Sequence, residues 1–325
     1  MKYYLAPLEG VTNLYYRKVF SKYFLNIDKY FIPFINPAQY NLSHRDLREI
    51  DINNNRLNKD VVPQIISNNS KETIWLINKL KEDGYKEVNL NFGCPSGTVV
   101  SKKRGGGILS DLNLLDTYLN EVFKKSCLPI SIKLRLGIND ANEFYNILNI
   151  LNKYNIKELI IHPRTVKEKY NGNLHLEILK DLNKLTTIPI IYNGEIKSLE
   201  DIEYIKTNFP YIDGIMLGRG LISYPDLLED NTNINEETRI NKVKSFFFEL
   251  YNEYLNKFGY NNTKFFVKEI WVMLINYFDI DKKSKKELLK AEKQQDLESV
   301  INKIFTTIPR KKYIESGIKK YINII

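Results

Sequence analysis

Eight short apolar segments alternate with longer, helix-like segments through the first two thirds of the sequence. The apolar segments are residues 3–6, 30–35, 61–66, 87–92, 129–134, 158–163, 189–193 and 212–217. Intervening stretches such as 71–84 and 142–155 are mostly long enough for a crossover helix between parallel strands. Buried strands that alternate with helices indicate a parallel sheet. Eight such units over about 220 residues favour a (β/α)8 TIM barrel over an open, doubly wound sheet.

The open-sheet alternative would also need a glycine-rich dinucleotide turn directly after the first strand. The first apolar segment instead runs into APLEGVT (6–12), which has no such turn. Three glycines at 105–107 do not directly follow a predicted strand. The sequence therefore predicts an α/β barrel.

A change of period after the polar stretch NTNINEET (231–238) predicts a linker and then a helical domain. Apolar residues at helical spacing follow at Val243, Phe246, Phe247, Leu250, Tyr251, Tyr254, Leu255 and Phe258. Residues 265–278 are apolar nearly all round and suit the middle of a bundle, and further helices are expected around 284–305 and 310–322. We predict a TIM-barrel domain over 1–235 and a small helical bundle over 236–325.

The positive charge of the chain is concentrated in its last quarter. Residues 239–325 carry 18 Lys and Arg against 10 Asp and Glu, whereas the rest of the chain carries 30 against 29. Such an excess occurs on ordinary solvated helices and on surfaces that bind a polyanion such as RNA. Composition alone leaves both interpretations open.

The small number of metal-binding and sulfur-bearing residues limits the class of protein. Two cysteines and three histidines favour neither a disulfide framework nor a four-ligand zinc site, so we expect no metal. Hydrophobic residues make up 43% of the chain, which excludes global disorder. No stretch approaches the roughly 18 apolar residues of a membrane span, and no signal-peptide pattern follows Met1. We expect a cytoplasmic monomer with reduced thiols and no membrane contact.

Polar residues gather where the predicted strands end, which is where the active site of a TIM barrel lies. They are Glu9, Gln64, Asn91, Cys94, Lys133, Arg135, His162, Arg164, Asn193, Glu195, Gly218 and Arg219. Taken alone, Lys133 could extend to solvent and His162 could be a core histidine. The whole set is harder to explain in this way, because many polar groups in apolar strands need hydrogen-bonding partners. The last two ends, NGEI and LGRG, suit a phosphate. Lys133 could face the electron-rich end of a ring or form a Schiff base.

Cys94 lies between a glycine and a proline, just past the fourth strand, on a loop expected to cover the barrel mouth. The same loop continues through Lys102, Lys103 and Arg104 into three glycines. This flexible basic loop suits an anionic macromolecular substrate, although an ordinary solvated lid has the same composition. Cys127 precedes the fifth strand, at the opposite end, and is expected to be a buried apolar filler.

Taken together, these motifs resemble those of the tRNA-dihydrouridine synthases. The matching segments, in order and at the expected spacing, are APLEGVT (6–12), VPQI (62–65), NLNFGCPS (89–96), GGGIL (105–109), IKLRLG (132–137), IIHPRT (160–165), NGEI (193–196) and LGRG (217–220). Leu8 and Glu195 stand where the family often has Met and Asp. The Glu-Gly after APL and the SGTV…GGG loop look closest to the branch that modifies position 16 in the D-loop.

The resemblance implies an FMN enzyme that reduces the C5–C6 double bond of a uridine in tRNA, with NADPH as the ultimate reductant. It implies that the flavin is bound by Pro7, Leu8, Glu9, Gln64, Lys133, His162, Asn193, Gly194, Glu195, Gly218 and Arg219. Gln64 and Lys133 would bond its ring, and His162 would hold its phosphate end. Cys94 would be the general acid and Asn91 would meet the target uracil. We expect further RNA contacts from Lys102, Lys103, Arg104, Arg135 and Arg164, and expect the helical domain to grip the tRNA backbone.

Three other functions explain less of the sequence. An FMN-dependent TIM-barrel oxidoreductase acting on a small molecule would share the phosphate site at the ends of the last two strands. It would leave the basic helical region without a role. A phosphosugar lyase would use Lys133 as a Schiff base. A non-catalytic RNA-binding module would explain the charge but not the polar residues at the strand ends.

Overall fold

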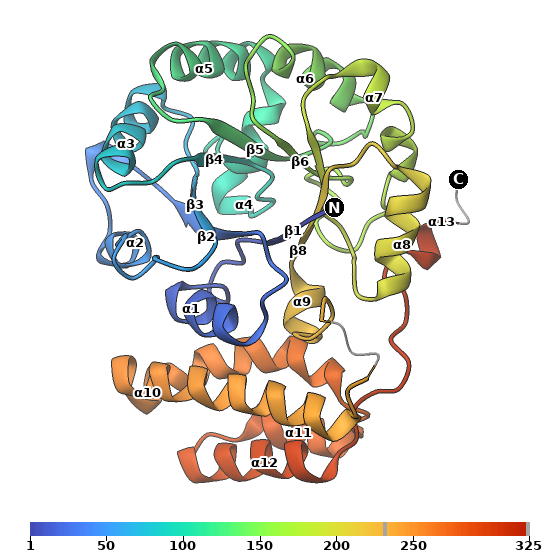
Figure 1. Cartoon of the computed structure of the whole chain (residues 1–325). Helices are drawn as coiled ribbons and strands as arrows, with labels where there is room; N and C mark the ends of the chain where they lie inside the picture. Colours follow the sequence, from blue (N-terminus) through green and yellow to red (C-terminus); the bar gives the residue numbers. More distant parts are fainter. Residues whose placement is uncertain (230–232, 323–325) are drawn as a thin grey trace.

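The computed structural model describes residues 1–229 and 233–322, which form a closed barrel of eight parallel strands with a helical domain beside it (Figure 1). The strands, in barrel order, are β1 (Lys2–Leu5), β2 (Lys29–Ile35), β3 (Asp60–Ile65), β4 (Val88–Phe92), β5 (Ile130–Arg135), β6 (Leu159–His162), β7 (Ile190–Tyr192) and β8 (Gly214–Leu217). Each predicted apolar segment overlaps one of these strands, and the ends differ by at most two residues. The predicted (β/α)8 barrel is therefore confirmed.

The segments between the strands form the outer layer of helices. They are α1 (Leu14–Tyr23), α2 (His44–Glu49), α3 (Ser70–Glu82), α4 (Gly97–Val100), α5 (Leu112–Lys125), α6 (Glu143–Leu151), α7 (Leu182–Leu185), α8 (Leu199–Asn208) and α9 (Arg219–Ser223), with 3₁₀ turns at Ala38–Tyr40, Gly105–Ser110 and Leu176–Leu179. Side-chain caps begin several of them. Asn13 caps α1, Asn69 caps α3, and Ser198 forms a capping box with Asp201 at α8.

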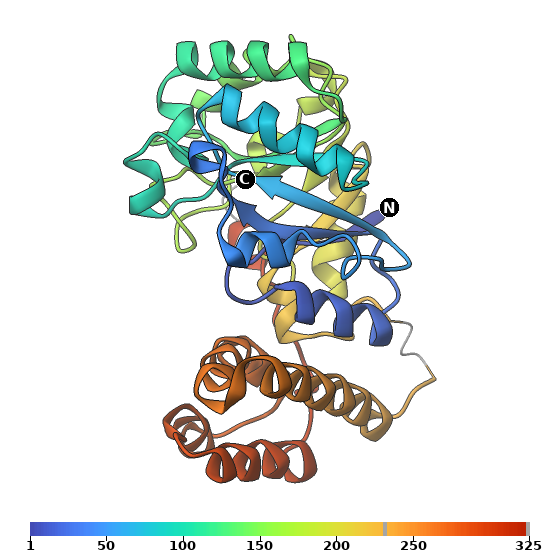
Figure 2. The same cartoon turned by 90° about the vertical axis from the view of Figure 1, so that its left-hand side faces the viewer.

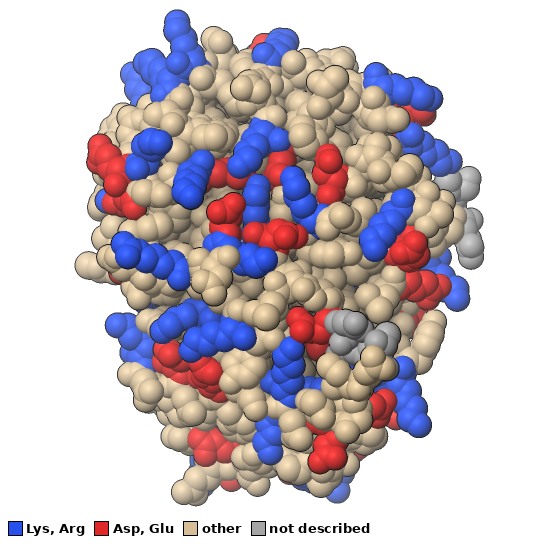
Figure 3. Space-filling model, in the orientation of Figure 1, with Lys and Arg blue, Asp and Glu red and all other residues tan. Residues whose placement is uncertain are grey.

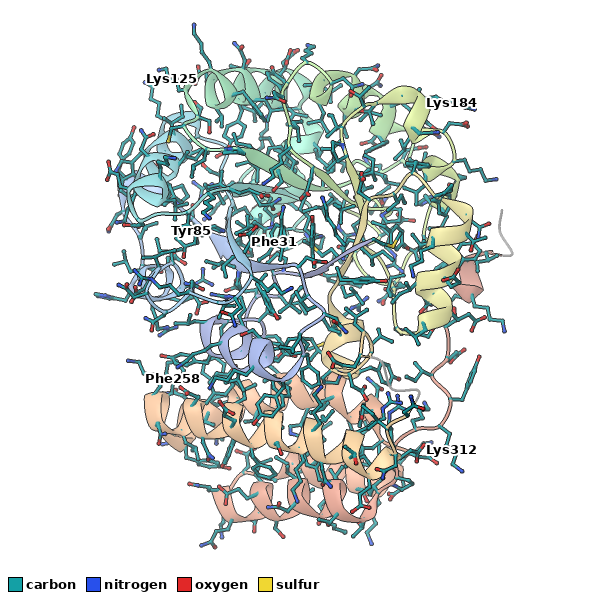
Figure 4. The ribbon with its side chains drawn as sticks, viewed as in Figure 1. Phe31, Tyr85, Lys125, Lys184, Phe258 and Lys312 are labelled. Carbon is teal, nitrogen blue, oxygen red and sulfur yellow. The ribbon has the colours of Figure 1, made fainter. Side chains whose placement is uncertain are left out.

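The barrel interior is apolar on one side and polar on the other. The apolar cluster consists of Tyr4, Ala6, Phe31, Val62, Ile160, Ile191 and Met216, and Figure 4 labels Phe31 near the centre of the barrel. These side chains come mainly from β1, β2, β6, β7 and β8. Strands β3, β4 and β5 instead direct buried Gln64, Asn89 and Ser131 inward. A packed barrel of this kind has a solid core and no pore.

An ionic cluster closes the end of the barrel where the strands begin. The buried Lys29 amine lies 2.9 Å from Glu87 and 2.8 Å from Glu158. Such a cluster is tolerated inside a protein because each charge has a partner. Figure 3 shows positive and negative side chains interleaved over the face that carries the N-terminus.

The helical domain is a bundle whose longest element folds back on itself. It contains α10 (Glu236–Leu274), a 3₁₀ turn at Ile275–Tyr277, α11 (Lys282–Lys290) and α12 (Gln294–Thr307). Gly259 breaks α10, because its φ of 69° and ψ of 166° belong to no helix. The ring pairs Tyr254–Phe266, at 5.1 Å, and Phe247–Trp271, at 5.4 Å, show two antiparallel arms. The expected helical domain is present. Residues 265–278 do not lie wholly in its interior, however, because Phe265 is 63% exposed and Val272 is 56% exposed.

The first arm of α10 packs on α1 of the barrel. Phe246 makes edge contacts with Phe20 at 5.6 Å and with Phe24 at 5.4 Å. The hydroxyl of Tyr254 donates to Asn13 at 3.2 Å. Buried aromatic contacts of this kind fix the helical domain against the barrel. Figure 2 shows α10 lying below α1.

The segment after α12, residues 309–322, is here called the C-terminal tail, and it returns to the barrel. Sequence periodicity predicted a helix over 310–322, but the helical part is α13 (Lys319–Ile322) alone. The carboxylate of Asp201, at the start of α8, accepts from the hydroxyl of Ser316 at 2.5 Å and from the amides of Gly317 at 3.0 Å and Ile318 at 3.2 Å. These bonds to Asp201 take the place of the hydrogen bonds that residues 316–318 would make within a helix. Figure 1 shows α13 beside α8.

Part of the predicted linker at 231–238 lies outside the described residues, and α10 begins at Glu236. Within 1–229 and 233–322, no helix is both long enough and apolar enough to span a membrane.

Candidate active site

A cavity of about 450 Å³ opens at the carboxyl ends of the strands. Of the residues predicted from the sequence, it is lined by Pro7, Leu8, Glu9, Gln64, Asn91, Cys94, Lys133, Arg135, His162, Asn193, Gly194, Glu195, Gly218 and Arg219. Its size is that of a typical cofactor site. The structure thus brings together the residues proposed for the flavin, the candidate acid and the candidate uracil contact, while Lys102, Lys103, Arg104 and Arg164 do not line the cavity.

A second cavity of about 450 Å³ lies near the opposite strand ends, between residues 152–156 and 183–189. Lys184 is the charged residue of its lining, alongside asparagines, threonines and apolar side chains. A TIM barrel places its catalytic groups at the carboxyl ends of the strands. We therefore assign the site to the cavity at the mouth.

Lys133 supplies an uncompensated amine to the mouth cavity. Within the described parts of the chain, no hydrogen bond or ion pair is made by its Nζ. Burial and the neighbouring charge of Arg135 lower the pKa of Lys133 to about 7. A buried amine without a partner can bind an anionic or electron-rich ligand, and such a ligand would raise the pKa of Lys133 again.

Cys94 presents a protonated thiol at the edge of the same cavity. Burial is the main cause that raises its pKa, and it outweighs the opposing effects of the Ser96 backbone and Arg135. The loop is held by Asn91, whose side-chain oxygen accepts from the amides of Gly93 at 3.0 Å and Cys94 at 2.9 Å. The thiol can therefore donate a proton at neutral pH from a fixed position.

The turns after β7 and β8 form a narrow corner at the other side of the cavity. Glu195 has a φ of 46°, an uncommon value for a residue with a side chain. Its carboxylate accepts from Arg164 at 2.9 Å and from Arg219 at 2.5 Å. Gly220 is required by packing, since a Cβ there would lie 1.8 Å from the Ile196 carbonyl oxygen. This corner combines close backbone approach with cationic side chains, as a phosphate site needs.

His162 is neutral and held in one tautomer. Its Nδ1 lies 2.8 Å from the Asn193 carbonyl oxygen, which can only accept, so Nδ1 carries the proton. Its Nε2 then accepts from Arg164 at 3.4 Å. Burial, followed by the charges of Arg135 and Lys133, holds the pKa of His162 well below its usual value.

Arg164 does not occupy the RNA-contacting position expected from the sequence. Its side chain is 0% exposed. Besides Glu195, it donates to the Tyr321 hydroxyl at 2.7 Å and to the Gly172 carbonyl at 2.9 Å. A buried guanidinium that has these partners cannot reach a polynucleotide. Arg164 instead joins the corner after β7 to the C-terminal tail.

Arg135 also faces inward rather than toward RNA. It donates to the backbone carbonyls of Gly93 at 2.9 Å and Thr165 at 3.0 Å. Its guanidinium lies 5.3 Å from the centre of the Tyr170 ring. Although Arg135 lines the cavity, its contacts hold the Cys94 loop to the loop after β6.

The three basic residues of the Cys94 loop lie outside the cavity and differ from one another. Lys103 pairs with Asp111 at 3.0 Å. Arg104 donates to Asn36 at 3.1 Å. Lys102 is exposed and makes no side-chain bond among the described residues. Of the three, Lys102 is therefore the most available to an anionic partner.

Cys127 corrects a sequence prediction. It lies at the opposite end of the barrel from Cys94, as expected, but it is exposed instead of buried. Its thiol contacts the Asn78 side-chain oxygen at 3.3 Å. Both cysteines are free thiols. No cluster of three or more His, Cys, Asp or Glu suited to a metal occurs in the described parts of the chain.

Several residues of the site were missed by sequence reasoning. Glu269 and Met273, on the second arm of α10, line the mouth cavity although they belong to the helical domain. Tyr170 lines it as well and packs under Arg219 at 4.8 Å. None of these lies in a strand or next to a recognisable motif. Gly317 and Tyr321 are also far from any motif, so no local signal identifies them.

Comparison with known proteins identifies the sequence family. The family model for dihydrouridine synthase matches residues 4–309. "tRNA-dihydrouridine synthase B" of Pasteurella multocida (strain Pm70) is 27% identical over 238 residues, which is 73% of this chain and 70% of that protein. "tRNA-dihydrouridine(16) synthase" of Aquipseudomonas alcaligenes is 33% identical over 147 residues, which is 44% of this chain and 46% of that protein.

Solved structures with a similar fold are more distant in sequence. Histamine dehydrogenase from Rhizobium sp. 4-9 has a TM-score of 0.53 at 11% identity, covering 75% of this chain and 49% of that one. Morphinone reductase has a TM-score of 0.51 at 10% identity, covering 70% of this chain and 84% of that one. At such identities the likeness extends to the barrel fold alone.

Proposed function

The chain belongs to the dihydrouridine synthase family, and we propose that it is a flavin-dependent enzyme that reduces the C5–C6 double bond of a uridine in tRNA. The observation that carries this function is the meeting of Lys133 and Cys94 in one cavity. The free amine of Lys133 suits the binding of a ring cofactor. The protonated thiol of Cys94 suits a reduction in which the substrate also needs a proton. The decisive experiment maps dihydrouridine in tRNA from a strain with and without this gene.

The residues of the mouth cavity fit FMN. Lys133 is an unpartnered amine in a partly apolar space, which suits the electron-rich edge of a flavin ring. The walls from Ala6, Leu8 and Met216 are apolar and suit its flat faces. Arg219 lies at the glycine-lined corner, where a phosphate monoester needs a cation.

Protonation of Lys133 makes flavin binding depend on pH. Lys133 is charged below its pKa of about 7 in the flavin-free protein, and an anionic partner would raise that pKa. Between the free and bound pKa values, binding must take up a proton, so affinity falls as pH rises. We expect the FMN dissociation constant to rise by up to about tenfold per pH unit above pH 7. Fluorescence titration from pH 7 to 9 measures this, and Lys133→Met should remove the dependence.

Cys94 is the proposed general acid. A flavin held in this cavity would, when reduced, supply the hydride for C6 of the uracil. The Cys94 thiol gives its proton to C5, which completes the saturated bond and leaves a thiolate that regains a proton from water. The raised pKa of Cys94 favours this role, because the thiol holds its proton until negative charge develops on the base.

A basic cleft that suits the RNA backbone lies beside the mouth cavity of the protein. A cleft of about 410 Å³ shares Lys197 with the mouth cavity. The tail contributes Lys311, Lys319 and Lys320 to its lining, all of them exposed. A target base must leave its folded RNA to reach the cavity, and cations beside the opening can hold the flanking phosphates. We propose that this cleft and the helical domain grip the tRNA.

Replacement of the tail lysines should weaken tRNA binding and reduce its salt dependence. For the variant with Lys311→Ala, Lys319→Ala and Lys320→Ala, the slope of log affinity against log salt should fall by about one for each phosphate that no longer has a lysine partner. Filter binding over a salt series measures this slope. The control replaces exposed Lys124 and Lys125, at the end of α5, with Ala. Equal slopes for the native protein and the triple variant would contradict the role of the cleft.

Finer features of the activity are also proposals. Relatives that modify position 16 and the sequence of the Cys94 loop support a uridine at position 16 of the D-loop as the target. We propose NADPH as the reductant. Two free thiols fit a reducing cytoplasm, and the protein is proposed to act there as a monomer. A barrel oxidoreductase acting on a small molecule is not favoured, because it gives the lysine-lined cleft no role.

A further inference from the structure

A series of buried side chains connects the Cys94 loop to the ionic cluster at the far end of the barrel. It consists of Asn91, Gln64, Asn89, Ser131 and Glu87, here called the interior network. Their exposed fractions are 8%, 1%, 0%, 0% and 4% respectively. The strand register explains their meeting, because β4 and β5 pair Asn89 with Ser131. Residues two apart in a strand point the same way, so Asn89 and Asn91 both face the interior.

Each of the first four members of the interior network donates one hydrogen bond to the next member. From the mouth downward, Asn91 Nδ2 donates to Gln64 Oε1 at 2.7 Å and Gln64 Nε2 donates to Asn89 Oδ1 at 2.8 Å. Asn89 Nδ2 then donates to Ser131 Oγ at 3.0 Å, and Ser131 Oγ donates to Glu87 Oε1 at 2.8 Å. The series is continuous over the length of the barrel.

The direction of donation is imposed from both ends. At the mouth, Asn91 Oδ1 receives the amides of Gly93 and Cys94, which can only donate. At the other end, the Glu87 carboxylate is paired with Lys29 and Lys157, so it can only accept. Reversal of any amide between them would set donor against donor. The oxygen and nitrogen of Gln64 are therefore fixed in place.

We propose that Asn89, Ser131 and Glu87 are positioning residues that orient Gln64 toward the flavin ring and hold the Cys94 loop. Gln64 lines the mouth cavity and uses one N–H and one lone pair within the network, so a second of each remains for a ligand. Ser131 and Glu87 act through Asn89 and do not touch the ring. This inference rests on the proposed flavin site.

The variant Ser131→Ala tests the proposal in the full-length protein. It leaves Asn89 Nδ2 without its acceptor and removes the far-end constraint on the amides of Asn89 and Gln64, which Asn91 alone then orients. We expect the FMN dissociation constant to rise about tenfold, the worth of one hydrogen bond, and the visible absorption band of bound FMN to shift. Ser131→Thr keeps the hydroxyl and should restore both values toward native.

Tyr4→Phe is the matched control. It removes a buried hydroxyl that donates to Glu158 at 2.7 Å in the same ionic cluster but stands outside the interior network. It should leave the affinity and spectrum of FMN unchanged. Native affinity and spectrum in Ser131→Ala, or an equal loss in Tyr4→Phe, would overturn the proposal. If Ser131→Ala does not fold, Glu87→Gln replaces it, because its amide can donate to Ser131 and so oppose the direction set at the mouth.

The flavin site and the positioning role of the interior network can be refuted separately. A native protein that takes up no FMN would refute the flavin site itself. A native protein that binds FMN, with Ser131→Ala and Glu87→Gln binding it identically, would refute only the positioning role of the interior network.

Discussion

Cys94→Ala should lose nearly all dihydrouridine formation while it keeps flavin and tRNA. General acids contribute about 100- to 10,000-fold to a rate, and the structure offers no second thiol near the mouth among the described residues. Neither Asn91 nor Arg135 bonds the thiol, since both bind backbone atoms of the loop. The loop should therefore keep its shape without the sulfur. Single-turnover reduction of tRNA by the flavin-loaded variant measures the effect on the chemical step.

Cys127→Ala is the matched control for this prediction. It removes the other thiol of the chain, which is exposed at the opposite end of the barrel. The control should turn over at the native rate. An unchanged single-turnover rate in Cys94→Ala, with native FMN content, would rule out the acid role of Cys94.

Gly317→Ala should weaken FMN binding by about a hundredfold or more, although Gly317 lines no part of the mouth cavity. An added Cβ would lie 1.7 Å from the Glu195 carbonyl oxygen, so the C-terminal tail must lift from the corner. Lifting would withdraw donors from the buried carboxylate of Asp201 and the hydroxyl of Tyr321 from Arg164. Buried charges that lose partners cost about 3–5 kcal/mol. FMN titration and thermal unfolding of the flavin-free protein measure the two consequences.

A pair of tyrosines supplies a milder version of the same test. Tyr321→Phe removes the hydroxyl that receives Arg164, and should weaken FMN binding by about tenfold. Tyr313→Phe removes a hydroxyl in the same tail from a residue that is 61% exposed, and should have no effect. Native FMN affinity in both Gly317→Ala and Tyr321→Phe would show that the tail has no part in the flavin site.

The barrel and most of its mouth could be predicted from the sequence because both follow from local pattern. Strands buried on two faces give continuous apolar runs, and the residue at the end of each run must lie at the mouth. The same alternation could have placed Asn89 and Ser131 in the interior, two residues before Asn91 and Lys133 respectively. Their polarity in otherwise apolar strands was the available signal.

Side-chain direction and long-range contact could not be predicted in this way. A motif gives Arg135 and Arg164 as cations, but the carbonyls and the Glu195 carboxylate that turn them inward come from other loops. Tyr321 reaches Arg164 across 157 residues of sequence, and Gly317 reaches Asp201 across 116. No periodicity links positions so far apart. The non-helical backbone at 316–318 likewise depends on Asp201, which only the folded barrel presents.

The return of the C-terminal tail to the barrel sets an order of assembly during synthesis. The ribosome completes all eight strands and the helical bundle before it makes Ser316, Gly317 and Tyr321. A nascent barrel can therefore close while Asp201 and Arg164 still lack these partners. Prematurely terminated chains that end within the bundle would carry a corner after β7 that lacks its contacts with the tail. The amount of cofactor that the protein retains in the cell should therefore show whether its mRNA was translated through the tail.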